Sequence, residues 1–138
     1  MEATILKLHE RSNDLGSLVF LEALKDIPFQ VKRVYYIYNV GVSVRRGIHA
    51  HKKLRQVLIC VHGSCKVMLD DGKEKIDVQL DDPTEGLLVD RMIWREMYDF
   101  SHDAVLLVLA SEYYDIADYI FEYDEFLRVI DEVEVELS

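Results

Sequence analysis

The chain has 138 residues, half of them apolar and spread along its whole length, so the composition predicts one compact domain and excludes a disordered or fibrous protein. A formal net charge of -10 argues against general nucleic-acid binding, because most of the surface would repel a polyanion. The apolar runs are far shorter than the roughly 20 residues of a membrane span, and the N-terminus lacks a secretory signal, so we expect a cytoplasmic protein.

Short β-rich stretches separated by turn signals run from residue 15 to about 110, a spacing typical of a β-sandwich or barrel. The clearest hairpin joins residues 64–69 to residues 75–80 across Asp71-Gly72, a turn dipeptide that tolerates positive φ. We therefore expect an all-β domain whose barrel covers about residues 15–110.

The pattern changes after Ser111, where apolar residues recur at intervals of three and four with acidic residues between them. This spacing predicts a C-terminal amphipathic helix over about residues 115–130, with an aromatic stripe that packs on the barrel or on a second subunit.

Charged residues and thiols give two further expectations. Cationic residues cluster between positions 32 and 55, and a local basic pocket in an acidic protein favours a small anion such as a nucleoside diphosphate. Cys60 and Cys65 form no CxxC pair, and Cys60 lies within an apolar run, so both are expected to be buried free thiols.

Residues 32–38 form a predicted strand whose alternation places Arg33 and Tyr35 on one face, and Tyr36 and Tyr38 on the other. If the first face points into the barrel, the guanidinium of Arg33 needs an anionic partner there. A bound phosphate group would supply that partner.

The most informative stretch carries His49 and His51, then Gln56, and then Gly63 after a further apolar run. This spacing resembles the first motif of the cupin superfamily of β-barrels, in which Glu usually stands at the position of Gln56. On a strand, both imidazoles point to the same face and line one cavity.

A metal-binding cupin would need more ligands than these two histidines. An amide stands at position 56 in place of the carboxylate, and Met97 stands where the third histidine is usual, so we expect no metal. A degenerate two-ligand metal site and a purely structural pair of histidines are the alternatives.

Seven segments, in order and at matching spacing from about residue 14 to 125, closely resemble the dTDP-4-keto-6-deoxyglucose 3,4-ketoisomerases. They are DLGSL (14–18), IPF (27–29), KRVYYI (32–37), RGIHAHKK (46–53), QVLIC (56–60), WREMYDF (94–100) and VLASEYYD (108–115). The resemblance implies a cupin-type jelly-roll β-barrel, a homodimer, and cofactor-free conversion of a dTDP-linked 4-keto-6-deoxyhexose into its 3-keto isomer. Such a reaction feeds the synthesis of 3-amino-3,6-dideoxyhexoses for bacterial surface glycans.

The reaction requires a base at C3, a stabiliser for the enediolate oxygen, and an acid that returns a proton at C4. His49 is the expected base, because a neutral imidazole both accepts and returns a proton near working pH. His51 is expected to assist as a proton shuttle or by fixing orientation. Tyr35 is expected to donate to the developing oxyanion or to carbon.

The expected substrate-binding residues are Arg33, Arg46 and Lys53 at the diphosphate, together with Gln56, Trp94 and Arg95. Trp94 would form a hydrophobic wall of the site, with core packing as its alternative. Within the resembled family, Arg95 favours a gluco-configured product. Leu15 departs from the Arg or Tyr that is frequent at its position, which the motif match places near the sugar.

Two other functions remain open. A cupin epimerase would act on the same nucleotide sugar at C3 and C5, and a non-catalytic module would bind the sugar nucleotide without turnover. Retention of titratable His49 and Tyr35 beside the cations argues against a module that only binds.

Overall fold

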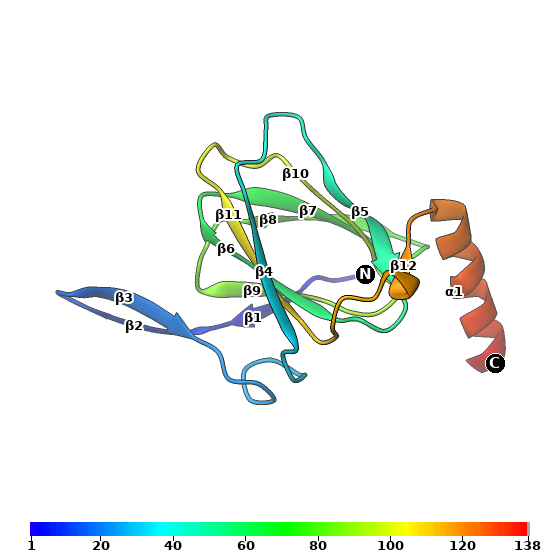
Figure 1. Ribbon diagram of the computed structural model, residues 1–138, viewed down its shortest axis with the longest axis horizontal. Helices are drawn as coiled ribbons and strands as arrows, with labels where there is room; N and C mark the ends of the chain where they lie inside the picture. The colour runs from blue at the N-terminus through cyan, green and yellow to red at the C-terminus, as the bar shows by residue number, and fades with distance from the viewer. Residues whose placement is uncertain (138) are drawn as a thin grey trace.

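The computed structural model describes residues 1–137. In this part of the chain, two five-stranded antiparallel sheets face each other (Figure 1). The first sheet has the order β1 (Thr4–Lys7), β9 (Glu85–Val89), β6 (Gln56–His62), β11 (Val105–Ala110) and β4 (Arg33–Tyr38). The second has the order β12 (Tyr119–Ile120), β5 (Arg46–His51), β10 (Trp94–Tyr98), β7 (Cys65–Asp70) and β8 (Lys75–Leu80). The domain is the expected cupin-type jelly roll.

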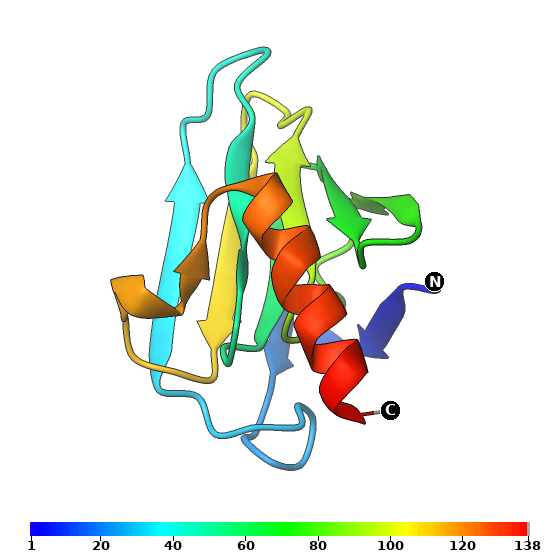
Figure 2. The ribbon, with the colours of Figure 1, turned by 90° about the vertical axis from the view of Figure 1, so that its right-hand side faces the viewer.

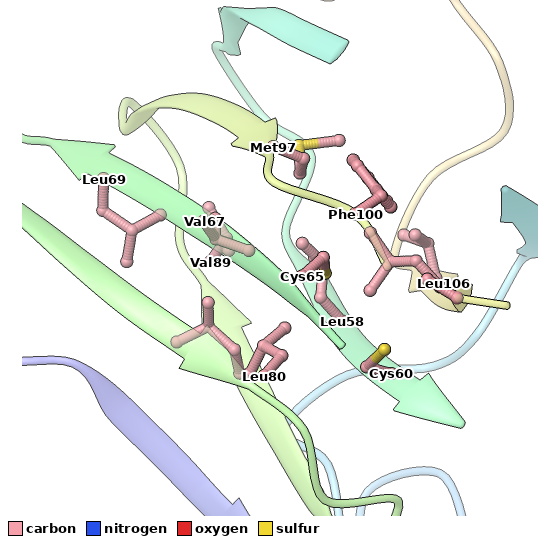
Figure 3. Close-up of a cluster of buried hydrophobic side chains, with 13 residues drawn as sticks. Leu58, Cys60, Cys65, Val67, Leu69, Leu80, Val89, Met97, Phe100 and Leu106 are labelled. Carbon is pink, nitrogen blue, oxygen red and sulfur yellow. The ribbon is translucent and has the colours of Figure 1, made fainter. Parts of the chain in front are cut away.

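The core lies between the two sheets and is filled by side chains from both (Figure 3). Leu58, Val67 and Leu106 are at most 1% exposed and belong to one cluster. Cys60 and Cys65 lie in the same cluster as buried free thiols, as the sequence predicts.

The predicted central hairpin is confirmed as β7 paired with β8, in register from Cys65 opposite Leu80 to Asp70 opposite Lys75. In the turn, Gly72 has a φ of 92° and donates its backbone N–H to the carboxylate of Asp70. Only glycine adopts this φ without strain, which is why the Asp-Gly signal located the hairpin correctly.

The barrel begins earlier than predicted, since β1 adds to the edge of the first sheet and Ile5 packs against the core. Strands β2 (His9–Asn13) and β3 (Gly16–Phe20) then form a separate hairpin that projects from the barrel (Figure 1). Every residue of β2 is exposed, because its polar sequence offers no apolar face to either sheet.

The C-terminal helix α1 spans Tyr123–Leu137 and therefore begins later than the predicted position near residue 115. Residues Ile116–Asp118 form a 3-10 turn, and the backbone of β12 is bonded to β5. Apolar spacing of three and four residues does not distinguish this arrangement from a longer helix. No described helix has the length and apolar character needed to cross a bilayer.

The aromatic stripe of α1 packs on the barrel, which is one of the two predicted alternatives; the other was packing on a second subunit. Phe126 is fully buried in a cluster with Trp94, Ala50 and Ile120. Tyr123 donates its hydroxyl to Asp70 at 2.6 Å. The helix thus lies against one face of the barrel (Figure 2).

Candidate active site

Strand β5 contains a β-bulge directly before the two histidines. Its pairing with β10 shifts between Arg95 and Glu96, and Gly47 and Ile48 have positive φ values of 82° and 60°. A β-branched residue rarely adopts such a φ, so the surrounding sheet holds Ile48 in a strained conformation. The bulge places the Gly47 carbonyl 2.9 Å from Nδ1 of His49. The ring of the first histidine is thereby oriented by its own strand.

His49 and His51 lie on the same face of β5, with their rings edge to face and their centroids 4.8 Å apart. Nδ1 of His49 donates to the Gly47 carbonyl, and Nδ1 of His51 donates to the carboxylate of Asp118 at 3.2 Å. In a neutral imidazole the other nitrogen, Nε2, then carries the free lone pair. Nε2 of His51 is buried and has no hydrogen-bond partner among the described residues.

Both imidazoles are neutral at physiological pH. Burial, followed by the positive charge of Arg95, lowers the pKa of His49 to about 4. The same two causes lower the pKa of His51 further. Each ring can therefore accept a proton without first losing one.

Gln56 connects Tyr35 to Arg95 inside the barrel. Its amide Nε2 donates to the hydroxyl oxygen of Tyr35 at 2.9 Å, and its Oε1 accepts from Nη1 of Arg95 at 2.6 Å. Arg95 is 1% exposed and also donates to the backbone carbonyl of Ile93. Burial raises the pKa of Tyr35, so its hydroxyl keeps its proton at neutral pH.

A cavity of about 320 Å³ opens beside these groups. Its polar and aromatic lining consists of Arg33, Tyr35, Arg46, His49, Tyr114 and Tyr119. The cavity lies between the first sheet, which supplies β4, and the second sheet, which supplies β5 and β12. Acid–base groups and cations therefore face one shared space.

Arg33 lines the cavity with a guanidinium that is partly buried and incompletely hydrogen-bonded. Its guanidinium lies 5.3 Å from the ring centroid of Tyr35 and 5.5 Å from that of Tyr114. Its Nε and Nη2 atoms are buried and have no hydrogen-bond partner among the described residues. Buried N–H groups are normally paired, so this guanidinium is suited to a bound anion such as a phosphate group.

Sequence reasoning missed Tyr114, which lines the cavity, and two residues that contact His51, Asp118 and Tyr119. The Asp118 carboxylate accepts the backbone N–H groups of Lys53 and Leu54 in addition to Nδ1 of His51. The Tyr119 ring centroid lies 4.3 Å from that of His51. Asp118 and Tyr119 were both assigned to the predicted helix, and no sequence motif distinguishes them from its other acidic and aromatic residues.

The structure brings together seven of the predicted site residues: Arg33, Tyr35, Arg46, His49, His51, Gln56 and Arg95. The other two predicted site residues, Lys53 and Trp94, lie outside this group, and so does Leu15.

Trp94 points to the opposite side of β10 from Arg95 and packs against Tyr123 and Phe126 of α1. Its predicted role as a wall of the site is therefore wrong, because strand alternation assigns the inward position to Arg95. Lys53 is exposed and lines other surface depressions. Leu15 is 95% exposed at the tip of the β2–β3 hairpin.

The position that carries a carboxylate in metal-binding cupins holds the Gln56 amide, and both of its polar atoms already have partners. The thioether of Met97 packs beside Gly47, at 3.0 Å from the place that a Cβ would occupy there. Within the described chain, no group of three or more His, Cys, Asp or Glu side chains is arranged to hold a metal ion.

Comparison with known proteins identifies close relatives. The chain is 48% identical over 136 residues to a TDP-4-oxo-6-deoxy-α-D-glucose 3,4-oxoisomerase from Aneurinibacillus thermoaerophilus, covering 99% of this chain and 98% of the relative. It is 45% identical to a crystallised mutant of the 3,4-ketoisomerase QdtA from Thermoanaerobacterium thermosaccharolyticum in complex with TDP-4-keto-6-deoxyglucose. That match has a TM-score of 0.92 and covers 94% of each chain.

Two Campylobacter jejuni enzymes differ in their similarity to this chain. The TDP-quinovose 3,4-ketoisomerase WlaRB is 50% identical, with a TM-score of 0.88 and coverage of 91% of this chain and 97% of WlaRB. The TDP-fucose 3,4-ketoisomerase WlaRA is 38% identical, with a TM-score of 0.88 and coverage of 94% and 96%. The epimerase NovW from Streptomyces spheroides is 19% identical and shares the fold alone.

The family model described as FdtA, WxcM-like, C-terminal, matches residues 1–131. This match covers both sheets, the bulged strand with its two histidines, and the segment that carries Asp118. The chain therefore belongs to the FdtA family and is a relative of the TDP-sugar 3,4-ketoisomerases.

Proposed function

We propose that this protein is a dTDP-4-keto-6-deoxyglucose 3,4-ketoisomerase that works without a cofactor. The observation that carries the proposal is the convergence of neutral His49, protonated Tyr35 and incompletely bonded Arg33 on one cavity. Acid–base groups and an anion-binding guanidinium are what a proton-transfer reaction on a sugar diphosphate requires. The relatives that act on or bind the TDP sugar support the same assignment.

The reaction removes the proton from C3 and returns one to C4 through an enediol. Nε2 of His49 accepts the C3 proton, since its Nδ1 is already bonded to the Gly47 carbonyl. The Tyr35 hydroxyl donates to the oxygen that becomes negative at C4. Nε2 of His51 is available to move a proton between the O3 and O4 oxygens. Return of a proton to C4 then leaves a ketone at C3 and a hydroxyl at C4.

The substrate enters with its diphosphate toward Arg33 and Arg46, which line the cavity from β4 of the first sheet and β5 of the second. Lys53 is not included, because its ammonium group is exposed outside this cavity. Gln56 and Arg95 lie at the sugar end, next to Tyr35.

Replacing Arg33 with methionine should weaken TDP binding by at least about tenfold, because the diphosphate loses a charge-assisted partner. Isothermal titration calorimetry with TDP measures the loss. Arg45→Met removes the same charge from a side chain that pairs with Glu96 and does not line the cavity, so it should change the Kd by less than about twofold. Equal losses in the two variants would mean that Arg33 contributes only general positive charge.

The rate should stay constant with decreasing pH over a range in which an ordinary histidine becomes protonated. With a pKa of about 4, His49 remains a base down to about pH 5, whereas an unperturbed imidazole is half protonated near pH 6.5. We expect kcat/KM to be flat from pH 8 to about pH 5 and to decrease below that. A midpoint near pH 6.5 would contradict the assigned environment of His49.

A proton NMR time course with fresh substrate and chelator-treated protein in deuterated buffer separates the candidate functions. A 3-keto product with deuterium at C4 is the expected result. Deuterium at C3 and C5 with the 4-ketone retained would identify an epimerase. TDP binding without any exchange would identify a non-catalytic module.

The product is expected to have the gluco configuration, because the chain is more similar to the quinovose enzyme than to the fucose enzyme, at 50% against 38% identity. Quinovose is 6-deoxyglucose and fucose is 6-deoxygalactose. In ordinary water, a large H4–H5 coupling in the product identifies the gluco isomer and a small one the galacto isomer.

The 3-keto sugar is a substrate for transamination to a 3-amino-3,6-dideoxyhexose, a component of bacterial surface glycans. Buried free Cys60 and Cys65 fit a reducing, cytoplasmic compartment.

The functional unit is a homodimer. A lone two-stranded hairpin is marginally stable in water, so the projecting β2–β3 hairpin favours packing on a second copy. The outer face of β4 also exposes Val34, Tyr36 and Tyr38. Only a second copy would bring Leu15 to a sugar site. Light scattering should give about twice the 16.1 kDa chain mass, and a monomer at micromolar concentration would rule out the dimer.

A further inference from the structure

Gln56 occupies the position that Glu holds in metal-binding cupins, yet it lies among groups that are not metal ligands. Its carboxamide is 3% exposed and bridges the Tyr35 hydroxyl and the Arg95 guanidinium. Both contacts are between groups of the protein itself.

The orientation of this amide follows from the chemistry of its neighbours. A guanidinium has five N–H donors and no acceptor, so the atom of Gln56 that faces Arg95 must be the carbonyl oxygen Oε1. The two are 2.6 Å apart. The amide nitrogen must then face Tyr35, where it donates to the hydroxyl oxygen at 2.9 Å.

A consequence follows for the proton of the Tyr35 hydroxyl. Because the oxygen accepts from the Gln56 amide, the hydroxyl proton cannot point back along the same line. Tyr35 also lines the cavity. We infer that Gln56, held by Arg95, is a positioning residue that directs the Tyr35 hydroxyl proton into the cavity.

This role explains why an amide stands at position 56. A glutamate there would still pair with Arg95. Its carboxylate, however, would accept a hydrogen bond from the Tyr35 hydroxyl, whereas the amide of Gln56 donates one to the hydroxyl oxygen. The hydroxyl would then be turned away from the sugar. The inference rests on the proposed function, in which Tyr35 is the donor to the substrate oxygen.

The hydrogen-bond direction can be tested without turnover. A trifluorotyrosine introduced at position 35 has a lowered phenol pKa, and its titration is followed by fluorine NMR in the otherwise unaltered chain and with Gln56→Met. Loss of a bond that stabilises the phenolate raises the pKa, whereas loss of an acceptor for the neutral hydroxyl lowers it. We expect the pKa to rise, and a fall would overturn the inference.

Kinetics test whether the direction matters to catalysis. Gln56→Glu should lower kcat about 100-fold with KM within about threefold, since one positioned donor is misdirected while the Arg95 pair is kept. In the Tyr35→Phe background, Gln56→Glu should cost less than about twofold, because the group through which it acts is absent. An equal loss in both backgrounds would show that Gln56 acts independently of Tyr35 and overturn the inference.

The two tests separate failure of the inference from failure of the proposed function. If the unaltered protein does not isomerise the sugar, the proposed function fails, while the fluorine titration still decides which way the hydrogen bond runs. If Gln56→Glu does not fold, the titration with Gln56→Met gives the same decision.

Discussion

Replacing His49 with asparagine should reduce kcat for ketoisomerisation by about 1000-fold, because a positioned general base contributes on the order of 100- to 10,000-fold to such a rate. Asparagine is a smaller polar side chain that cannot accept a proton near neutral pH. The Kd for TDP should change by less than about threefold, since the cations at the cavity are unaltered. Stopped-flow or NMR assays give the rate, and calorimetry gives the Kd.

The matched control is His62→Asn, which makes the same substitution in an exposed ring that contacts Asp103 outside the cavity. It should retain full activity. A further check is exchange at C3, which should be lost together with turnover in the His49 variant. Turnover at a similar rate with unchanged binding would mean that another group is the base.

Local signals predicted an all-β sandwich or barrel, and the family resemblance narrowed this to a jelly roll. The Asp-Gly turn placed the β7–β8 hairpin correctly, and strand alternation put Arg33 with Tyr35, and His49 with His51, on shared faces. Alternation alone left open which face of β4 points inward, and the structure places Arg33 and Tyr35 at the cavity. Such patterns depend on neighbours two to ten residues apart, which a single sequence displays directly.

The errors occur where contacts between distant segments decide the outcome. Apolar spacing of three and four fits a helix over residues 116–120, but Ile116–Asp118 form a 3-10 turn and the backbone of Tyr119–Ile120 pairs with β5. Asp118 and His51 are separated by 67 positions in the sequence, and no motif predicts their contact. Trp94 was misassigned for the same reason, because the motif match does not show which face of β10 packs against α1.

The bulge in β5 is a further feature that the sequence did not predict. The HxH spacing indicated two rings on one face, but a regular strand would leave the Gly47 carbonyl bonded within the sheet. Positive φ at Gly47 and Ile48 turns that carbonyl toward Nδ1 of His49 and thereby fixes its tautomer. Whether Nε2 of His49 is free to act as the proposed base thus depends on these two irregular residues in the strand.

The tautomer of His51 depends on a different partner, the Asp118 carboxylate. The carboxylate can only accept, so it holds the proton on Nδ1 and leaves Nε2 as an acceptor inside the site. In Asp118→Asn, an amide oxygen at the Oδ1 position keeps the backbone N–H of Lys53, while the amide nitrogen replaces Oδ2, the atom that accepts from both the Leu54 N–H and Nδ1 of His51. That nitrogen donates to Nδ1, so the proton moves to Nε2 and the ring can no longer accept one there.

We therefore expect Asp118→Asn to lower kcat about 100-fold while the Kd for TDP changes by less than about threefold, because the substitution changes the tautomer of the proton-carrying His51 ring and removes no diphosphate ligand. Nitrogen-15 NMR of the histidine side chains should show His51 changing from the Nδ1–H to the Nε2–H form. Asp115→Asn is the matched control, since that carboxylate caps the same 3-10 turn through the Ala117 N–H and bonds to no histidine of the described chain. If both variants lose activity equally and the His51 tautomer stays unchanged, Asp118 supports the turn and not the chemistry. If only Asp118→Asn loses activity and the tautomer changes, the segment before β12 supplies a working part of the active site.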